Sequence, residues 1–191
     1  MKPRQRALEA ATYVAAILIL AALVHLLVVS IVPRVAARDA FAKLEPLGGL
    51  GETIVLPRAS PKERLLPYAD PAVAMSICRF DLALGPIRVT APTGRAFASI
   101  SFHTRRGLVF YELTDKAASH GLIGAVLATP DDIRSLAAHD EEENPSRDLR
   151  IAAPDNDGYV AMRVFSQLPS LYAEAEAEAR QLKCQPEPIP K

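Results

Sequence analysis

The sequence predicts an α+β protein, with an N-terminal transmembrane helix followed by a β-rich domain that has an antiparallel sheet and two helices. Three observations lead to this fold class. Residues 10–32 hold 20 apolar side chains out of 23 and carry no charge. From residue 73 onward, short runs typical of β-strands alternate with turn residues. Two segments with helical character come late in the chain, between and after the strands, which is typical of α+β domains.

Residues 10–32 predict a transmembrane helix that follows a short tail, residues 1–9. At about 1.5 Å per residue the run spans roughly 34 Å, enough to cross a hydrocarbon core of about 30 Å. Pro33 then interrupts the helical hydrogen bonding. A cleaved signal peptide is the alternative, but its apolar region normally has about 7–15 residues. We therefore favour an uncleaved anchor.

The orientation of this helix depends on the basic residues around it. Equal numbers flank the apolar run: Lys2, Arg4 and Arg6 before it, and Arg34, Arg38 and Lys43 after it. A basic tail directly before the first apolar run is typical of a signal anchor, and long domains translocate largely regardless of charge. The expected location is a bacterial inner membrane, crossed once, with a cytoplasmic N-terminus and a periplasmic domain.

One face of the predicted membrane helix carries small and polar side chains. Ala11, Ala15, Ala22 and His25 share this face and form a candidate interface for a second helix. Because alanine is common throughout the chain, such a stripe also arises easily by chance. Both interpretations stay open.

Residues 33–72 contain many prolines and glycines and predict a tether and extended lead-in, with residues 52–56 as a strand. The domain proper is expected over residues 73–184. Its predicted strands are residues 73–80, 87–91, 97–103, 108–114, 122–128, 149–153 and 159–165.

The strand predicted at residues 97–103 alternates strictly between apolar and polar positions. Ser99, Ser101 and His103 share the polar side, so this side is expected to face water or to line a site.

Two helices are predicted, followed by a tail. Thr129-Pro130-Asp131-Asp132 gives a helix start with an N-cap hydroxyl and early carboxylates, so a helix is expected to about residue 139. The second helix is expected at residues 170–182. Residues 185–191 alternate with prolines and predict a disordered, polyproline-like tail.

The net charge of the chain argues against nucleic acid as a partner. The chain has 22 basic and 22 acidic residues, so nothing in its net charge favours nucleic acid binding.

Cys78 and Cys184 are its two cysteines. In an oxidising compartment a pair is more often bridged than free, and the bridge would close a long loop. The alternative is a buried Cys78 and an incidental Cys184.

Sequence motifs for catalysis and for cofactor binding are absent. The four histidines, at positions 25, 103, 120 and 139, lack the spacing of metal ligands. Phosphate loops, dinucleotide fingerprints and nucleophile elbows are also missing. We therefore expect no catalytic residue, no cofactor and no metal.

The densest polar cluster lies around a predicted hairpin turn, and it is the candidate ligand site. It consists of His103, Arg105, Arg106, Tyr111 and Asp81. Paired arginines beside a histidine suit an anionic group. Tyr68, Asp70 and Arg79 are expected to border the same sheet. The alternative is that the arginines form a solvated hairpin tip and that Asp81 and Arg79 are cross-strand partners.

Four segments carry a resemblance to a known family: PYADP at residues 67–71, SICRFD at 76–81, ASISFHTRRG at 98–107 and VFYELTD at 109–115. They resemble small proteobacterial membrane proteins with one N-terminal helix and a β-rich domain of unknown function. In larger relatives, a similar domain precedes a second domain of unknown function. In the small membrane form, that second domain is commonly a separate protein. The resemblance implies a location and a partner, but no reaction and no catalytic residue.

Two functions are compatible with these features. The first is an uncharacterised single-pass inner-membrane protein, embedded in the lipid bilayer, whose periplasmic domain binds the separately encoded sibling protein. The alternative is an envelope enzyme or anionic-ligand-binding protein with a pocket around His103, Arg105 and Arg106.

Overall fold

The computed structural model describes residues 3–35, 40–62, 65, 69–138 and 149–188. The chain divides into two compact units, Met1–Arg38 and Asp39–Lys191. The first unit is formed by helix α1 (Pro3–Val35). Within it, residues Leu8–Val32 are long and apolar enough to cross a membrane, and none of the most apolar stretch is buried.

The second unit contains two β-sheets. The larger sheet has the strand order β1-β2-β8-β4-β5, all antiparallel. Its strands are β1 (Thr53–Val55), β2 (Val73–Asp81), β8 (Asp157–Phe165), β4 (Ala98–Thr104) and β5 (Val109–Thr114).

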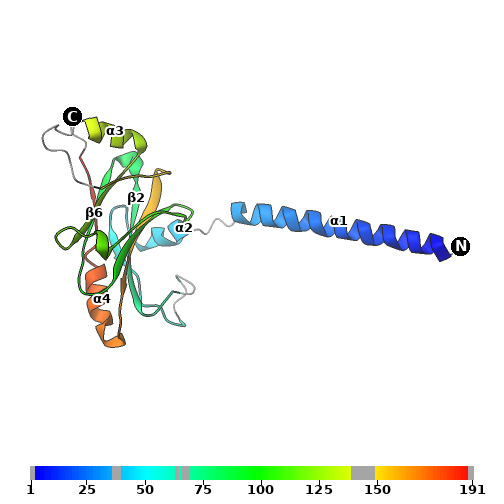
Figure 1. The fold of residues 1–191 in the computed structure, drawn as a ribbon, viewed down its shortest axis with the longest axis horizontal. Helices are drawn as coiled ribbons and strands as arrows, with labels where there is room; N and C mark the ends of the chain where they lie inside the picture. Colours follow the sequence, from blue (N-terminus) through cyan, green and yellow to red (C-terminus); the bar gives the residue numbers. More distant parts are fainter. Residues whose placement is uncertain (1–2, 36–39, 63–64, 66–68, 139–148, 189–191) are drawn as a thin grey trace. The chain divides into compact units, whose positions relative to one another are not determined.

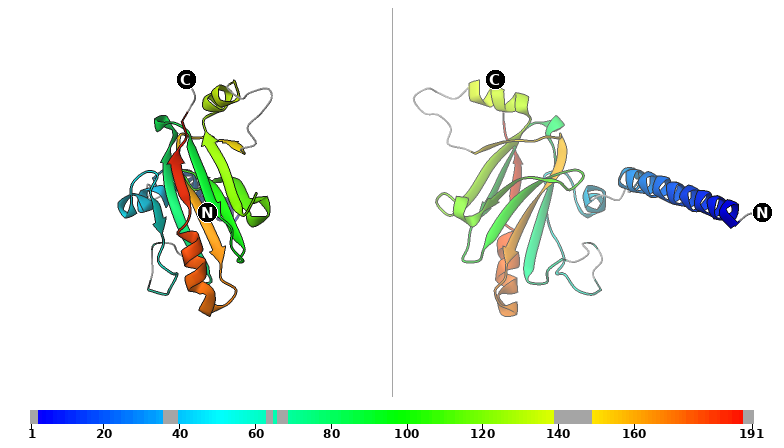
Figure 2. Two further views of the ribbon diagram at one scale, coloured as in Figure 1. Left: turned by 90° about the vertical axis from the view of Figure 1, so that its left-hand side faces the viewer. Right: turned by 45° about the vertical axis from the view of Figure 1, so that its right-hand side comes forward.

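The smaller sheet has the order β7-β6-β3-β9, and β7 runs parallel to β6. Its strands are β7 (Arg150–Ala152), β6 (Leu122–Ala128), β3 (Ile87–Pro92) and β9 (Lys183–Pro186). Figure 2 shows the short red β9 beside the green β3, as their register requires.

Short helices connect and cover these strands. They are α2 (Ala40–Leu44), α3 (Pro130–Ala138), α4 (Tyr172–Ala179) and four 3-10 turns, η1 (Glu45–Leu47), η2 (Leu82–Leu84), η3 (Asp115–Ala117) and η4 (Pro169–Leu171). Figure 1 shows α3 and α4 at opposite ends of this unit. Thr129 caps α3 as its sequence predicts, because its hydroxyl oxygen accepts a hydrogen bond from the Asp132 amide at 3.2 Å.

The main core lies between the two sheets, because every second side chain of a strand points to the same face. Phe80, Phe102 and Met162 of the larger sheet pack in one cluster with Val89 and Leu127 of the smaller sheet. Ala175 and Ala179 of α4 belong to the same cluster.

A second apolar cluster covers the outer face of the larger sheet. Phe41 and Leu44 of α2 pack with Ile77 of β2 and with Tyr159 and Ala161 of β8. Because both faces of this sheet are covered, all seven residues of β4 are buried.

The predicted fold class is confirmed: an apolar N-terminal helix precedes a sheet-rich α+β domain with mainly antiparallel pairing. Three details differ from prediction. The polar side of β4 is buried rather than wet. Within the expected tether and lead-in, the chain forms the additional helix α2, whereas the strand predicted at residues 52–56 is present as β1. Gln185 and Pro186 of the expected tail form part of β9, since an edge strand tolerates proline and β3 offers unpaired backbone there.

Candidate functional site

A buried polar network lies on the outer face of the larger sheet, where β4 pairs with β8. Ser101 and His103 are adjacent on this face of β4, only 1% and 5% exposed. The Ser101 hydroxyl oxygen lies 2.9 Å from His103 Nε2. The same oxygen accepts a hydrogen bond from Arg163 Nη1 at 2.6 Å. The His103 ring stacks on Tyr159, with 4.6 Å between ring centroids.

The hydrogen bonds of His103 define its tautomer. Nδ1 faces the carbonyl oxygen of Gly107 at 3.3 Å, and a carbonyl only accepts. Nδ1 therefore carries the hydrogen in the neutral ring, and Nε2 accepts from the Ser101 hydroxyl. The carbonyl of Ala161, 3.3 Å from the same hydroxyl, is its alternative acceptor. This chain of bonds satisfies groups that would be costly to bury unpaired.

Burial lowers the pKa of His103 below its usual value. The hydrogen bond to Gly107 and the charge of Glu112 oppose this shift, whereas the charge of Arg163 adds to it. The fold therefore favours the neutral ring. Because Ser101 and His103 are almost fully covered, this arrangement stabilises the sheet rather than presenting a nucleophile to solvent.

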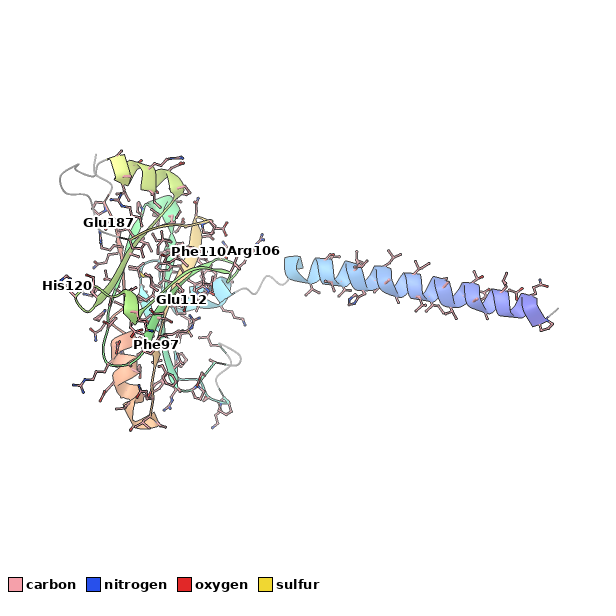
Figure 3. All side chains as sticks on the ribbon, viewed as in Figure 1. Phe97, Arg106, Phe110, Glu112, His120 and Glu187 are labelled. Atoms are coloured by element: carbon pink, nitrogen blue, oxygen red, sulfur yellow. A yellow bond between two sulfur atoms is a disulfide. The ribbon has the colours of Figure 1, made fainter. Side chains whose placement is uncertain are left out.

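The other residues of the predicted ligand site do not converge on His103. Arg105 Nη1 forms an ion pair with Asp157 Oδ2 at 2.8 Å. Arg106 is exposed on the loop between β4 and β5, where Figure 3 labels it. Tyr111 lies edge-on to Phe102, whose ring is on the opposite face of β4 from His103. Asp81 Oδ1 accepts a hydrogen bond from the Ala83 amide at 2.9 Å and caps η2.

Three further residues were expected beside this sheet. Asp70 Oδ1 accepts from the Ala72 amide at 2.8 Å in a turn. Arg79 is buried, and its Nη2 donates to the Gly48 carbonyl at 2.8 Å. Tyr68 lies outside the described residues. Sequence reasoning missed Arg163, which lies 62 positions from Ser101 and reaches it only through strand pairing.

Cys78 of β2 and Cys184 of β9 are joined as a disulfide, with their Cα atoms 6.5 Å apart. The bond therefore links the larger sheet to the edge of the smaller one. Both cysteines are buried in the main core. Cys184 lies in a strand and not at the end of the last helix, because α4 ends at Ala179.

A hollow of about 670 Å³ lies beside α4, and we call it the α4 groove. Its wall combines the end of β3 and the following loop, residues 92–96, with residues 165–167 at the end of β8. Leu171, Glu174, Glu178 and Gln181 complete it. The exposed Phe97, labelled in Figure 3, adjoins this wall.

Comparison with known proteins places the chain in a family. Residues 51–186 match the family described as "Protein of unknown function (DUF1254)". The chain belongs to the DUF1254 family. The match covers most of the second unit and leaves α1 outside it.

The DUF1254 fold also occurs among solved structures. The VPA0106 protein from Vibrio parahaemolyticus matches 80% of this chain with a TM-score of 0.54 and 13% sequence identity, over 37% of its own length. An uncharacterized protein from Burkholderia cenocepacia matches 79% of this chain with a TM-score of 0.49 and 14% identity, over 40% of its length. The DUF1254 chain thus spans less than half of either protein. None of the curated proteins compared with it matches.

Two further kinds of site were considered in this DUF1254 protein, a helix interface in α1 and a metal site. Ala11, Ala15, Ala22 and His25 lie in α1, where their use as a helix interface stays a prediction. Among the described residues, no group of three or more histidine, cysteine, aspartate or glutamate side chains is placed to hold a metal.

The depressed pKa of His103 predicts that acid destabilises the DUF1254 domain. Below pH about 6.5, the histidine of the unfolded chain binds a proton, whereas the folded ring resists protonation. The free energy of unfolding therefore decreases as pH falls. His103→Gln should flatten the dependence of the unfolding free energy on pH between 5 and 7.5, by at most about 1.4 kcal/mol per pH unit. Urea unfolding followed by circular dichroism measures this slope. The exposed His120→Gln serves as the control, and an unchanged slope in His103→Gln would contradict the prediction.

Proposed function

We propose that this DUF1254 protein is a single-pass protein of the bacterial inner membrane that presents its domain to the periplasm. There the domain binds a separate partner protein through the α4 groove. The observation that carries the proposal is the apolar rim of that groove.

Two large apolar side chains that line this hollow, Phe165 and Leu171, are exposed, and Phe97 and Leu168 are exposed next to lining residues in the chain. Phe97, Phe165, Leu168 and Leu171 are 50%, 40%, 57% and 37% exposed. Backbone bonds hold each of these neighbours near a lining residue: the Phe165 amide donates to the Phe97 carbonyl at 2.9 Å, and the Leu171 amide donates to the Leu168 carbonyl at 2.9 Å. Single exposed apolar residues are ordinary, but a cluster around a concave surface is typical of a binding site.

The polar side chains in the groove suit a protein partner. Arg95, Glu174 and Gln181 line it among the apolar groups. Glu178 is already engaged, because its Oε1 accepts a hydrogen bond from the Gly94 amide at 2.8 Å and fixes the loop against α4. An apolar centre with polar edges is the usual composition of a protein interface.

The partner that fits best is the separately encoded sibling protein implied by the family resemblance. This chain spans 37% of the VPA0106 protein. In the small membrane form that the chain resembles, the second domain is commonly a separate protein, and it is the partner that we assign to the groove.

Two features support the membrane and periplasmic parts of the proposal. The run Leu8–Val32 is long and apolar enough for an anchor, and a basic tail precedes it. The Cys78–Cys184 disulfide suits an oxidising compartment, because such bonds persist there and are rare in the cytosol.

Cross-linking in spheroplasts tests location and partner together. A membrane-impermeant, amine-reactive cross-linker reaches the exposed Lys62, Lys116 and Lys183 if the domain is periplasmic. We expect one adduct, identified by mass spectrometry as the sibling protein. Leu171→Asp should reduce this adduct roughly 30-fold, the effect of losing about 2 kcal/mol from an apolar contact in the groove.

Leu84→Asp is the matched control, because Leu84 is 79% exposed and precedes β3, whereas the groove lies at the far end of that strand. Lysines that stay unlabelled in intact spheroplasts would contradict the periplasmic orientation. Labelled lysines without an adduct, or an adduct equally strong in Leu171→Asp, would contradict partner binding at the groove.

A further inference from the structure

We propose that the surface formed by α2, η1 and the loop between β4 and β5 binds acidic phospholipid headgroups. We call it the α2 surface, and its exposed residues include the basic Lys43, Arg105 and Arg106, the apolar Leu47, Leu50 and Leu108, and the acidic Glu45. This inference rests on the proposed membrane anchor, and it assigns a second surface, separate in residues from the α4 groove.

Contacts of Phe41 make these segments one surface. The centroid of its ring lies 5.1 Å from the guanidinium carbon of Arg79 and 5.0 Å from that of Arg105. Arg105 comes from the loop after β4, and Phe41 from α2. The distances are typical of cation–π contacts, which hold the hairpin tip against α2.

The segment after α2 is fixed to the same place. Arg79 Nη2 donates to the Gly48 carbonyl at 2.8 Å, and Leu50 forms a β-bridge with Arg79. Leu47 and Leu50 are therefore held near Phe41, and they are 43% and 46% exposed.

The composition of the α2 surface matches that of a membrane interface. Leu108, at the hairpin tip, is 69% exposed, and the exposed Arg106 lies two positions before it. Lys43 is exposed on α2. Asp157 is paired with Arg105, so Lys43 and Arg106 supply the remaining positive charge, against the exposed carboxylate of Glu45 on η1. Apolar side chains that enter the headgroup region beside basic ones are typical of interfacial segments.

The position of the surface in the chain argues for lipid as its occupant. Residues 36–39 alone separate α1 from α2 in the sequence. In the sequence, Arg34 near the end of α1 and Arg38 in residues 36–39 are also basic. If α1 is inserted, the chain leaves the bilayer and enters the domain at this surface, where headgroups are the most concentrated anions.

Because the chain contains no tryptophan, a single tryptophan is a clean probe. We would reconstitute full-length Leu108→Trp in nanodiscs of neutral phosphatidylcholine and in nanodiscs with added phosphatidylglycerol. We expect the emission maximum to shift to shorter wavelength in the acidic discs. The shift should be lost in Lys43→Glu/Arg106→Glu and reduced by high salt. Circular dichroism checks that each variant is folded.

Leu122→Trp is the control probe, since Leu122 is 44% exposed and begins β6 in the smaller sheet. Lys183→Glu is the control for charge reversal. No shift in either disc, or an equal shift in both, would overturn the headgroup site while leaving the anchor in place. Failure of the chain to co-migrate with any nanodisc would overturn the anchor, and this inference with it.

Discussion

Replacing Cys78 and Cys184 together by alanine should lower the free energy of unfolding of the domain by about 4–5 kcal/mol. The disulfide closes a loop with a sequence separation of 106 residues, so it removes much of the freedom of the unfolded chain. Since small domains are stable by about 5–15 kcal/mol, this is a large part of the total.

The disulfide also stabilises the edge strand β9 of the smaller sheet. β9 has four residues and pairs with β3 alone among the strands. The bond ties this short edge strand to β2, which lies between β1 and β8 in the larger sheet. Without it, we expect β9 to separate first, and amide hydrogen exchange in residues 183–186 should rise before exchange elsewhere.

Urea unfolding of the full chain in mild detergent, followed by circular dichroism, measures this effect. The double variant loses both the cross-link and the two buried sulfur atoms. Wild-type protein treated with a reductant separates these two contributions to stability, because it keeps both thiols but loses the cross-link. We expect reduction to account for most of the loss and the alanine substitutions to add little. A double variant within about 1 kcal/mol of the oxidised wild type would contradict the prediction.

Local sequence patterns were sufficient to predict most of the fold. The run at residues 122–128 matches β6, and the capping residues at 129–132 predict the start of α3. β9 and α2 were missed for a physical reason. Both are short, and the residues that stabilise them lie far away in sequence: β3 pairs with β9, and Arg79 contacts Phe41 of α2.

The candidate site was only partly predictable, for the same reason. His103 and Ser101 were singled out by their shared side of a strand, and they do contact each other. Their third partner, Arg163, depends on the register that places Ser99 opposite it and Ala161 opposite Ser101. Arg105 and Arg106 were grouped with His103 because they are neighbours in sequence. At a hairpin turn, however, successive side chains diverge.

Gly158→Ala should destabilise the domain by about 3 kcal/mol, the upper part of the range for overpacked cores. Gly158 lies in β8 between Phe80 of β2 and Thr104 of β4. A Cβ atom there would overlap the backbone carbonyl oxygen of His103 and lie 2.7 Å from the Phe80 ring. A backbone oxygen in the middle of a sheet cannot move aside cheaply, so β8 and β4 would have to separate.

Gly124→Ala in β6 is the matched control, because a Cβ atom there meets only Thr90 Cγ2 within 4 Å, at an ordinary 3.8 Å. Neither glycine has a positive φ, so space and not backbone conformation decides the outcome. We expect Gly124→Ala to stay within about 1 kcal/mol of wild type in the same urea experiment. Equal stabilities of the two variants would contradict this account.

The close approach at Gly158 also positions the next residue, Tyr159, to stack on His103. Gly158→Ala should therefore also weaken the pH dependence that His103 gives the wild type, an effect that a general loss of packing elsewhere would not produce.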